Sequence, residues 1–349
     1  MEEHRESKLN NTVIKDAIPH SFTNGDIIAP LTIEKGQFNA IRGWLNNETI
    51  IYQTNVEQGS SVYTYNLFTG ETKLLFESEA PIATVLANPA GSKILIHAAP
   101  STYEGEITII DLDGQELMKK KLEAFDFEFK WNPYDEDTLL ISLFTENWDF
   151  TTLQLNVVLK EISEVSLKEP FAYWVDENDV LYLNWSDASL FAPLMKKSLV
   201  NASETMMLNE IYFVETIKNL VMTITVNQEQ KEQAVYSFLT SDFHQLSSFS
   251  IPHLARFSDW FIPFSSFDSD NHFFTFKPLY STDVDEYREG FQLISFDILE
   301  KKEMVLLEDM KNEPLSCSPN GKYCLYGFYL EKLIDVEMKQ IIPLVEQRL

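Results

Sequence analysis

A hairpin pattern that recurs along the chain is the feature that most limits the folds open to this sequence. Apolar, β-prone residues flank a short polar turn at residues 65–71, and residues 110–115, 296–302 and 334–339 repeat the pattern. The small polar residue of each turn recurs at Asn66, Asp111, Asn156, Ser198, Ser237, Asp297 and Asp335. Five of the six intervals are 38 to 45 residues long, which is about the length of one four-stranded propeller blade.

The repeat therefore predicts an all-β fold, a β-propeller of four-stranded antiparallel blades. Each unit reads as strand, turn, strand, loop, strand, turn, strand, and sustained helical periodicity is nearly absent. Seven hairpins predict seven blades, with six as the alternative. Residues 1–35 are expected to be a polar N-terminal tether with a possible closure strand, and residues 36–349 a single propeller domain. The approximate blades are 38–78, 80–123, 125–168, 170–209, 211–251, 255–308 and 313–346.

The net charge of the chain and the length of its apolar runs limit which partners and which membrane contacts are expected. Lys and Arg number 27 against 54 Asp and Glu, which gives a net charge of −27. Such a surface repels phosphates, so we expect no nucleic-acid partner. It also disfavours direct adsorption to anionic lipid. No apolar run approaches the roughly 20 residues needed to cross a bilayer, so no transmembrane segment is expected.

The two cysteines, Cys317 and Cys324, flank the turn at residues 318–322. If this turn closes onto a left-handed glycine bulge, Ser318 pairs with Lys322. Cys324 then points to the opposite side of the sheet from Cys317, although a disulfide needs Cα atoms closer than about 7 Å. The pattern predicts two free, mostly buried thiols.

Residues 43–52 and 63–76 resemble the YqgU-like β-propeller proteins of Gram-positive bacteria, some of which are described as six-bladed. The resemblance extends over most of the chain beyond residue 35. It implies an extracytoplasmic, cell-surface lipoprotein whose precursor carries a lipidated Cys after its leader. Residues 2–11 would suit the tether behind that Cys, which this chain lacks, so a cytoplasmic location is the alternative. The family supplies no catalytic residues to transfer.

Motifs for catalysis are scarce. The six histidines form no metal-binding spacing, and no Gly-x-Ser-x-Gly elbow is present. Residues 268–271 have only a weak likeness to a calcium loop and favour a polar hairpin turn. Apolar residues such as Phe127, Phe129 and Phe213 begin the expected inner strands, which argues against an axial metal cage. We therefore expect no catalytic residues, no metal and no cofactor.

Loops between the second and third strands carry aromatic residues with no clear core role. In a propeller these loops share one face with the loops that join blades. Exposed Trp and Tyr are enriched at binding hot spots because they offer large contact area at small entropic cost. The candidate binding residues are Tyr103, Trp148, Asp149, Trp185, Asp187, Phe191, Tyr280 and Tyr287.

These features favour a non-catalytic binding or scaffold module with a protein or peptide partner. A carbohydrate or cell-wall ligand is the alternative, because rings beside Asn147, Asp149 and Asp187 would suit sugar hydroxyls. A metal-dependent, lactonase-like hydrolase with an axial site is a third alternative.

Overall fold

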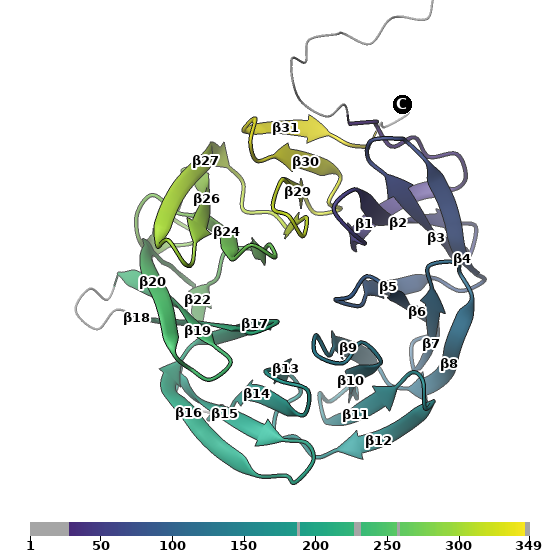
Figure 1. Cartoon of the computed structure of the whole chain (residues 1–349), viewed down its shortest axis with the longest axis horizontal. Coiled ribbons are helices and arrows are strands. Elements are labelled where there is room, and N and C mark those ends of the chain that lie inside the picture. Colours follow the sequence, from purple (N-terminus) through teal and green to yellow (C-terminus); the bar gives the residue numbers. More distant parts are fainter. Residues whose placement is uncertain (1–27, 187–188, 227–231, 257–258, 346–349) are drawn as a thin grey trace, which may run out of the picture.

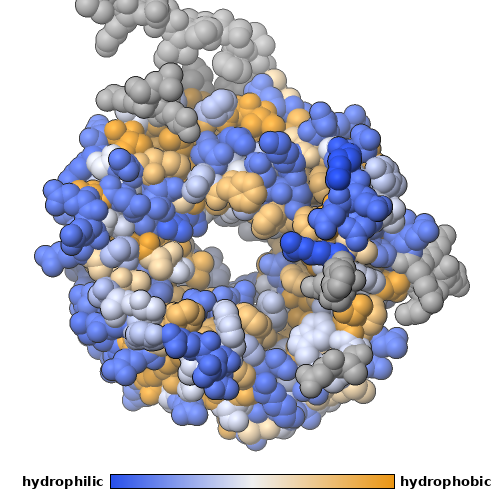
Figure 2. All heavy atoms as spheres, turned by 180° about the vertical axis from the view of Figure 1, so that it is seen from behind, coloured by the Kyte–Doolittle hydropathy of each residue, from blue (hydrophilic) through white to orange (hydrophobic). Residues whose placement is uncertain are grey.

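The computed structural model describes residues 28–186, 189–226, 232–256 and 259–345. In this part of the chain, seven four-stranded antiparallel sheets follow one another in sequence order around a common centre (Figure 1). A space-filling view shows an opening at the centre of the ring (Figure 2). No helix in these residues is long and apolar enough to cross a membrane. The all-β propeller expected from the repeat is therefore confirmed.

The strands of the seven sheets have the following bounds. The first two sheets contain β1 (Gln37–Trp44), β2 (Thr49–Val56), β3 (Gly59–Asn66), β4 (Thr72–Ser78), β5 (Ile82–Ala87), β6 (Lys93–Ser101), β7 (Glu104–Asp111) and β8 (Glu116–Glu123). The next two contain β9 (Asp126–Trp131), β10 (Thr138–Phe144), β11 (Phe150–Asn156), β12 (Glu161–Val165), β13 (Tyr173–Trp174), β14 (Asp179–Leu183), β15 (Ala192–Ser198) and β16 (Glu204–Ile211). The last three contain β17 (Phe213–Ile217), β18 (Leu220–Val226), β19 (Gln233–Thr240), β20 (Gln245–Pro252), β23 (Ser265–Phe267), β24 (His272–Lys277), β26 (Phe291–Asp297), β27 (Lys302–Met310), β28 (Leu315–Cys317), β29 (Tyr323–Tyr326), β30 (Lys332–Asp335) and β31 (Gln340–Pro343).

The first strand of each sheet lies toward the centre and the fourth lies at the rim (Figure 1). The second strands are buried on both faces, because each sheet packs between two neighbours. Their sequences are accordingly rich in apolar residues, as in β10, of which every residue but Leu143 is buried. The fourth strands are largely exposed to solvent, as in β8, most of whose residues are charged. The core is thus a series of apolar layers between sheets.

The recurring polar residue of the sequence repeat caps the turn between the third and fourth strands. The Asn66 side-chain oxygen accepts hydrogen bonds from the amides of Phe68 and Thr69. The Asp111 and Asp297 carboxylates accept equivalent bonds in their own turns. Such side-chain to backbone bonds stabilise turns, which explains why Asn and Asp recur there. Ser237 does not fit this scheme, because it lies inside β19 and its turn begins at Thr240 instead.

Indole nitrogens join the innermost strands of adjacent sheets. Trp174 Nε1 donates to the carbonyl of Lys130 over 3.1 Å. Trp44 Nε1 donates to the carbonyl of Ser316 over 2.8 Å, and this bond links the first sheet to the last. Beside this junction, Leu31 forms an isolated parallel bridge with Val345. Residues 1–27 of the expected tether lie outside the described residues.

The sixth sheet begins later than the sequence suggested. The expected blade 255–308 starts at β21 (Leu254–Arg256), but this strand pairs with β22 (Asp259–Phe261) and β25 (Thr282–Asp283) in a separate three-stranded sheet. The sixth sheet itself starts at β23. The long interval in the repeat therefore contains an additional small sheet rather than a single loop insertion.

The prediction of free thiols is wrong, because Cys317 and Cys324 form a disulfide. The Ser318 amide donates to the carbonyl of Tyr323 over 2.7 Å, so Ser318 is opposite Tyr323 rather than Lys322. Cys317 then lies directly opposite Cys324, with a Cα–Cα distance of 3.8 Å. A register difference of one residue moves a side chain to the other face of a strand. The assumed turn was one residue too short, and that error separated the two cysteines.

Candidate functional site

The loops between second and third strands and the loops between successive sheets emerge on the same side of the ring. This follows from the antiparallel order of each sheet, because the second strand ends where the first began. Tyr103, Trp148, Trp185 and Tyr280 all lie in loops of the first kind. We call this side the aromatic loop face.

Exposed aromatic side chains gather on this face. In the described part of the chain, the largely exposed rings are Tyr103, Phe125, Trp148, Phe171, Trp185, Phe264, Tyr280, Phe328 and Tyr329. All nine lie in loops of the aromatic loop face. The opposite hairpin tips expose aliphatic residues instead, such as Val200 and Leu299. The two faces of the ring therefore differ in chemistry, not only in position.

Five of these rings were missed by sequence reasoning, namely Phe125, Phe171, Phe264, Phe328 and Tyr329. Phe125, Phe171 and Phe264 lie in connections between sheets, and the other two lie between β29 and β30. Adjacent Phe and Tyr in the loop after Tyr326 were a visible signal. The inter-sheet rings gave no such signal, because the candidate residues were sought in the loops between second and third strands.

Trp148 is held at the tip of a tight hairpin. The Trp148 amide donates to the carbonyl of Thr145 over 3.0 Å, and the Thr145 amide donates to the carbonyl of Asp149 over 2.9 Å. The backbone of Trp148 is left-handed, with φ of 66°, a conformation that is uncommon for large residues and that occurs at ligand sites. Its ring is 65% exposed and packs edge-on against the Phe144 ring, at 5.8 Å between centroids.

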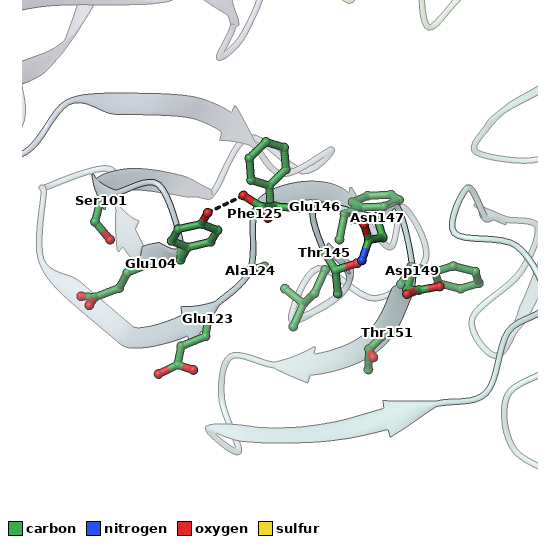
Figure 3. Close-up of a pocket in the computed structure, with 14 residues that line it drawn as sticks. Ser101, Glu104, Glu123, Ala124, Phe125, Thr145, Glu146, Asn147, Asp149 and Thr151 are labelled. Carbon is green, nitrogen blue, oxygen red and sulfur yellow. Dashed lines mark hydrogen bonds between the residues drawn. The ribbon is translucent and has the colours of Figure 1, made fainter.

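A cavity of about 710 Å³ lies beside this hairpin, between the second and third sheets. The Tyr103 hydroxyl donates a hydrogen bond to the Glu146 carboxylate across the cavity, from one sheet's loop to the next (Figure 3). The Phe125 ring stands beside this pair, 6.4 Å from the Tyr103 ring. Asp149 also lines the cavity. The cavity thus brings the predicted residues Tyr103 and Asp149 together with Phe125 and Glu146, which were not predicted.

The loop of the fourth sheet contributes a second, smaller hollow. Trp185 is 42% exposed and borders this hollow with Tyr212 and Ile262. Phe191 is half-buried and packs edge-on against Trp260 at 5.6 Å. Asp187 lies outside the described residues.

The two predicted tyrosines in the loop of the sixth sheet have different roles, because one is exposed and the other is buried. Tyr280 is 45% exposed and packs on Tyr287 at 5.2 Å. Tyr287 is only 8% exposed. Its hydroxyl accepts from the Leu279 amide and donates to the Gly290 carbonyl, so it fixes the loop internally. Tyr287 therefore holds Tyr280 in place rather than offering a surface itself.

The centre of the ring is more polar than the sequence suggested. Phe129 packs between sheets, while Lys130 Nζ lies 3.9 Å from Glu128 and 5.0 Å above the Tyr173 ring. Burial raises the pKa of both Glu128 and Glu215, and Lys130 partly opposes this. Burial and these two carboxylates raise the pKa of Tyr173 to about 12.

Groups that could bind a metal or activate a nucleophile are sparse. Within residues that the structure describes, no three His, Cys, Asp or Glu side chains are grouped to hold an ion. The calcium-like segment is a hairpin turn, in which Asp268 accepts bonds from the amides of Asp270 and His272. Asp268 also bonds His272 Nδ1 at 2.7 Å, which ties the turn together.

The ring of sheets and the aromatic loop face define a β-propeller with a chemically distinct surface on one side. A sequence model described as the YqgU-like 6-bladed beta propeller domain matches residues 66–327, and the chain belongs to this family. It is 28% identical over 323 residues to the uncharacterized lipoprotein YqgU of Bacillus subtilis (strain 168), covering 90% of this chain and 87% of the relative.

Solved structures show the same fold. The uncharacterized protein lmo1340 from Listeria monocytogenes EGD-e matches with a TM-score of 0.85 and 23% identity, over 92% of this chain and 98% of that one. The β-propeller domain of the Trilobed protease from Pyrococcus furiosus matches with a TM-score of 0.59 and 13% identity, over 89% and 98%.

The family match does not extend over the whole ring of sheets. The match begins at Asn66, the last residue of β3, and ends at Gly327, just after β29. It therefore contains the sheets from β5 to β27 completely, but only part of the first sheet and part of the last.

Proposed function

We propose that this propeller is a non-catalytic binding module whose aromatic loop face receives a protein or peptide partner. The observation that carries the proposal is that all nine largely exposed rings of the described residues lie on this face. Aromatic residues are enriched at the centres of protein interfaces relative to the rest of the surface. Trp148 adds a large ring that is 65% exposed at the tip of a hairpin on this face.

We further propose an extracytoplasmic location and a ring of seven blades. The location is supported by the relative's description as a lipoprotein and by the Cys317–Cys324 disulfide, because disulfides persist mainly in oxidising compartments. The blade number is supported by the seven four-stranded sheets of the described residues.

A carbohydrate ligand is the second candidate. The cavity beside Trp148 combines rings with the polar side chains of Asn147, Asp149 and Thr145, a mixture that suits sugar rings and hydroxyls. A sugar would stack on one ring, whereas a protein partner would engage rings of several loops at once.

Chemical cross-linking to an envelope extract from the source organism tests the proposal. The wild-type chain is compared with Trp148→Ala/Trp185→Ala, and with Val200→Ala/Leu299→Ala as a control on the opposite face. We expect one protein to be retained by the wild type and the control but lost from the tryptophan variant. Equal capture by all three chains would remove the support for the aromatic loop face, and a glycan array would then test the second candidate.

A further inference from the structure

The cavity between the second and third sheets is lined by both apolar side chains and carboxylates. Three loops build it, from β6–β7, β8–β9 and β10–β11. Rings and aliphatic groups form the apolar part, with Tyr103, Phe125 and Phe144 among them. Carboxylates form the polar part. A cavity of about 710 Å³ has room for a long amino-acid side chain with its flanking backbone.

The charges in this cavity have one sign. Its lining contains Glu104, Glu123, Glu146 and Asp149, and none of the fourteen lining residues is Lys, Arg or His. Lys121 pairs with Glu104 at 2.8 Å, at the edge. Among the described residues, no ion pair neutralises the other three carboxylates at their present positions. A cationic group entering the cavity would therefore meet uncompensated negative charge.

The Glu146 carboxylate has a defined orientation in the cavity. The Tyr103 hydroxyl bonds one Glu146 oxygen, which orients the carboxylate beside the Phe125 ring (Figure 3). This bond raises the pKa of the Tyr103 hydroxyl, so the hydroxyl remains a donor. A guanidinium stacks on aromatic faces and pairs with carboxylates in the same plane, whereas an ammonium offers only a point charge.

We propose that this cavity receives an arginine side chain of the partner, presented by a basic segment. The inference rests on the proposed function and names the chemistry of its partner. Tyr103 and Phe125 supply the ring faces, and Glu146 with Asp149 supplies the carboxylates. The net charge of −27 acts in the same direction, because it attracts a basic segment from a distance and raises the association rate.

Nuclear magnetic resonance titration tests this inference with defined probes. The probes are the acetylated, amidated peptide Gly-Gly-Arg-Gly-Gly and the same peptide with citrulline, which keeps the shape of arginine without its charge. A lysine version and glucosamine complete the set. We expect shifts at amides of residues 101–104, 123–126 and 144–150 with arginine, smaller shifts with lysine, and almost none with citrulline. Binding should weaken as ionic strength rises.

Variants separate the charge from the fold. Glu146→Gln keeps the acceptor for Tyr103 but removes the charge, and should weaken arginine binding about threefold, as expected for one partly exposed ion pair. Phe125→Ala should weaken it by a similar factor through the lost ring face. Glu300→Gln, at an exposed hairpin tip on the opposite face, is the matched control and should leave binding unchanged.

Three results would overturn the inference. They are citrulline binding as tightly as arginine, equal loss in the Glu300→Gln control, or no shift in the cavity with any cationic probe. Glucosamine binding more strongly than arginine would assign the cavity to an amino sugar and would also overturn it. The proposed function is judged separately, by the tryptophan variant in the capture experiment. If that variant loses the partner but the titration shows no preference for arginine, only the assignment of the cavity to arginine is refuted.

Discussion

Reduction of the Cys317–Cys324 disulfide should lower the stability of the propeller by a calculable amount. The bridge closes a loop with a sequence separation of 7. The chain-entropy relation for such a loop gives a stabilisation of about 2.4 kcal/mol at 25 °C. Both cysteines are buried, at 7% and 0% exposed, and reduction removes no side-chain atoms from the core. The loss of packing on reduction is therefore small beside the entropic effect.

Urea unfolding followed by tryptophan fluorescence, with and without reductant, measures this effect. We expect the free energy of unfolding to fall by about 2 kcal/mol when the disulfide is reduced. The variant Cys317→Ala/Cys324→Ala should be less stable than the oxidised protein and should not respond to reductant. Because that variant also loses buried sulfur atoms, the comparison within the wild type gives the cleaner value.

Two findings would refute this reasoning. One is an unchanged free energy of unfolding after thiol titration has shown complete reduction. The other is two reactive thiols in protein denatured without reductant, which would show that the cysteines are free. In that case the register of β28 and β29, rather than the entropy calculation, would be in error.

Three further predictions concern His97, Glu215 and Phe238. Burial lowers the pKa of His97 below its usual value, with Asp126 opposing, so the folded chain should lose stability as pH falls below about 6.5. Thermal unfolding across pH 5 to 8 should show this loss in the wild type but a flatter profile in His97→Leu. The raised pKa of Glu215 means that stability is lost as pH rises from about 4.5 through the folded value. Glu215→Gln should therefore gain stability relative to the wild type between pH 4.5 and 7.5, and a pH-independent difference would contradict this. Phe238 is fully buried and stacks on Phe296 at 5.7 Å, so Phe238→Ala should cost about 3–5 kcal/mol in chemical denaturation. A loss below about 1 kcal/mol would show that the interface between these sheets is not close-packed.

Much of the candidate site could be anticipated from loop position alone. Tyr103, Trp148 and Trp185 were singled out because each lies between the second and third strands of a repeat, and all three are exposed on one face. Their neighbours could not be predicted in the same way. Glu146 meets Tyr103 only because two sheets pack side by side, and the residues are 43 positions apart in sequence.

Burial within a loop was equally out of reach. Tyr280 and Tyr287 lie in the same loop, yet one is exposed and the other supports it. The difference depends on how the loop folds over Gly290 and Phe291, which no local pattern specifies.

The sequence by itself determined the propeller, because turn residues and apolar strands recur at a spacing that only four-stranded units satisfy. The Asx caps at Asn66, Asp111 and Asp297 are local interactions, so their signal is readable one turn at a time. The tertiary structure decided what depends on register and on neighbouring sheets. The one-residue register at residues 318–322 placed Cys317 opposite Cys324, and the packing of adjacent sheets created the cavity. Both are set by contacts between segments, and such contacts leave no fixed spacing in the chain.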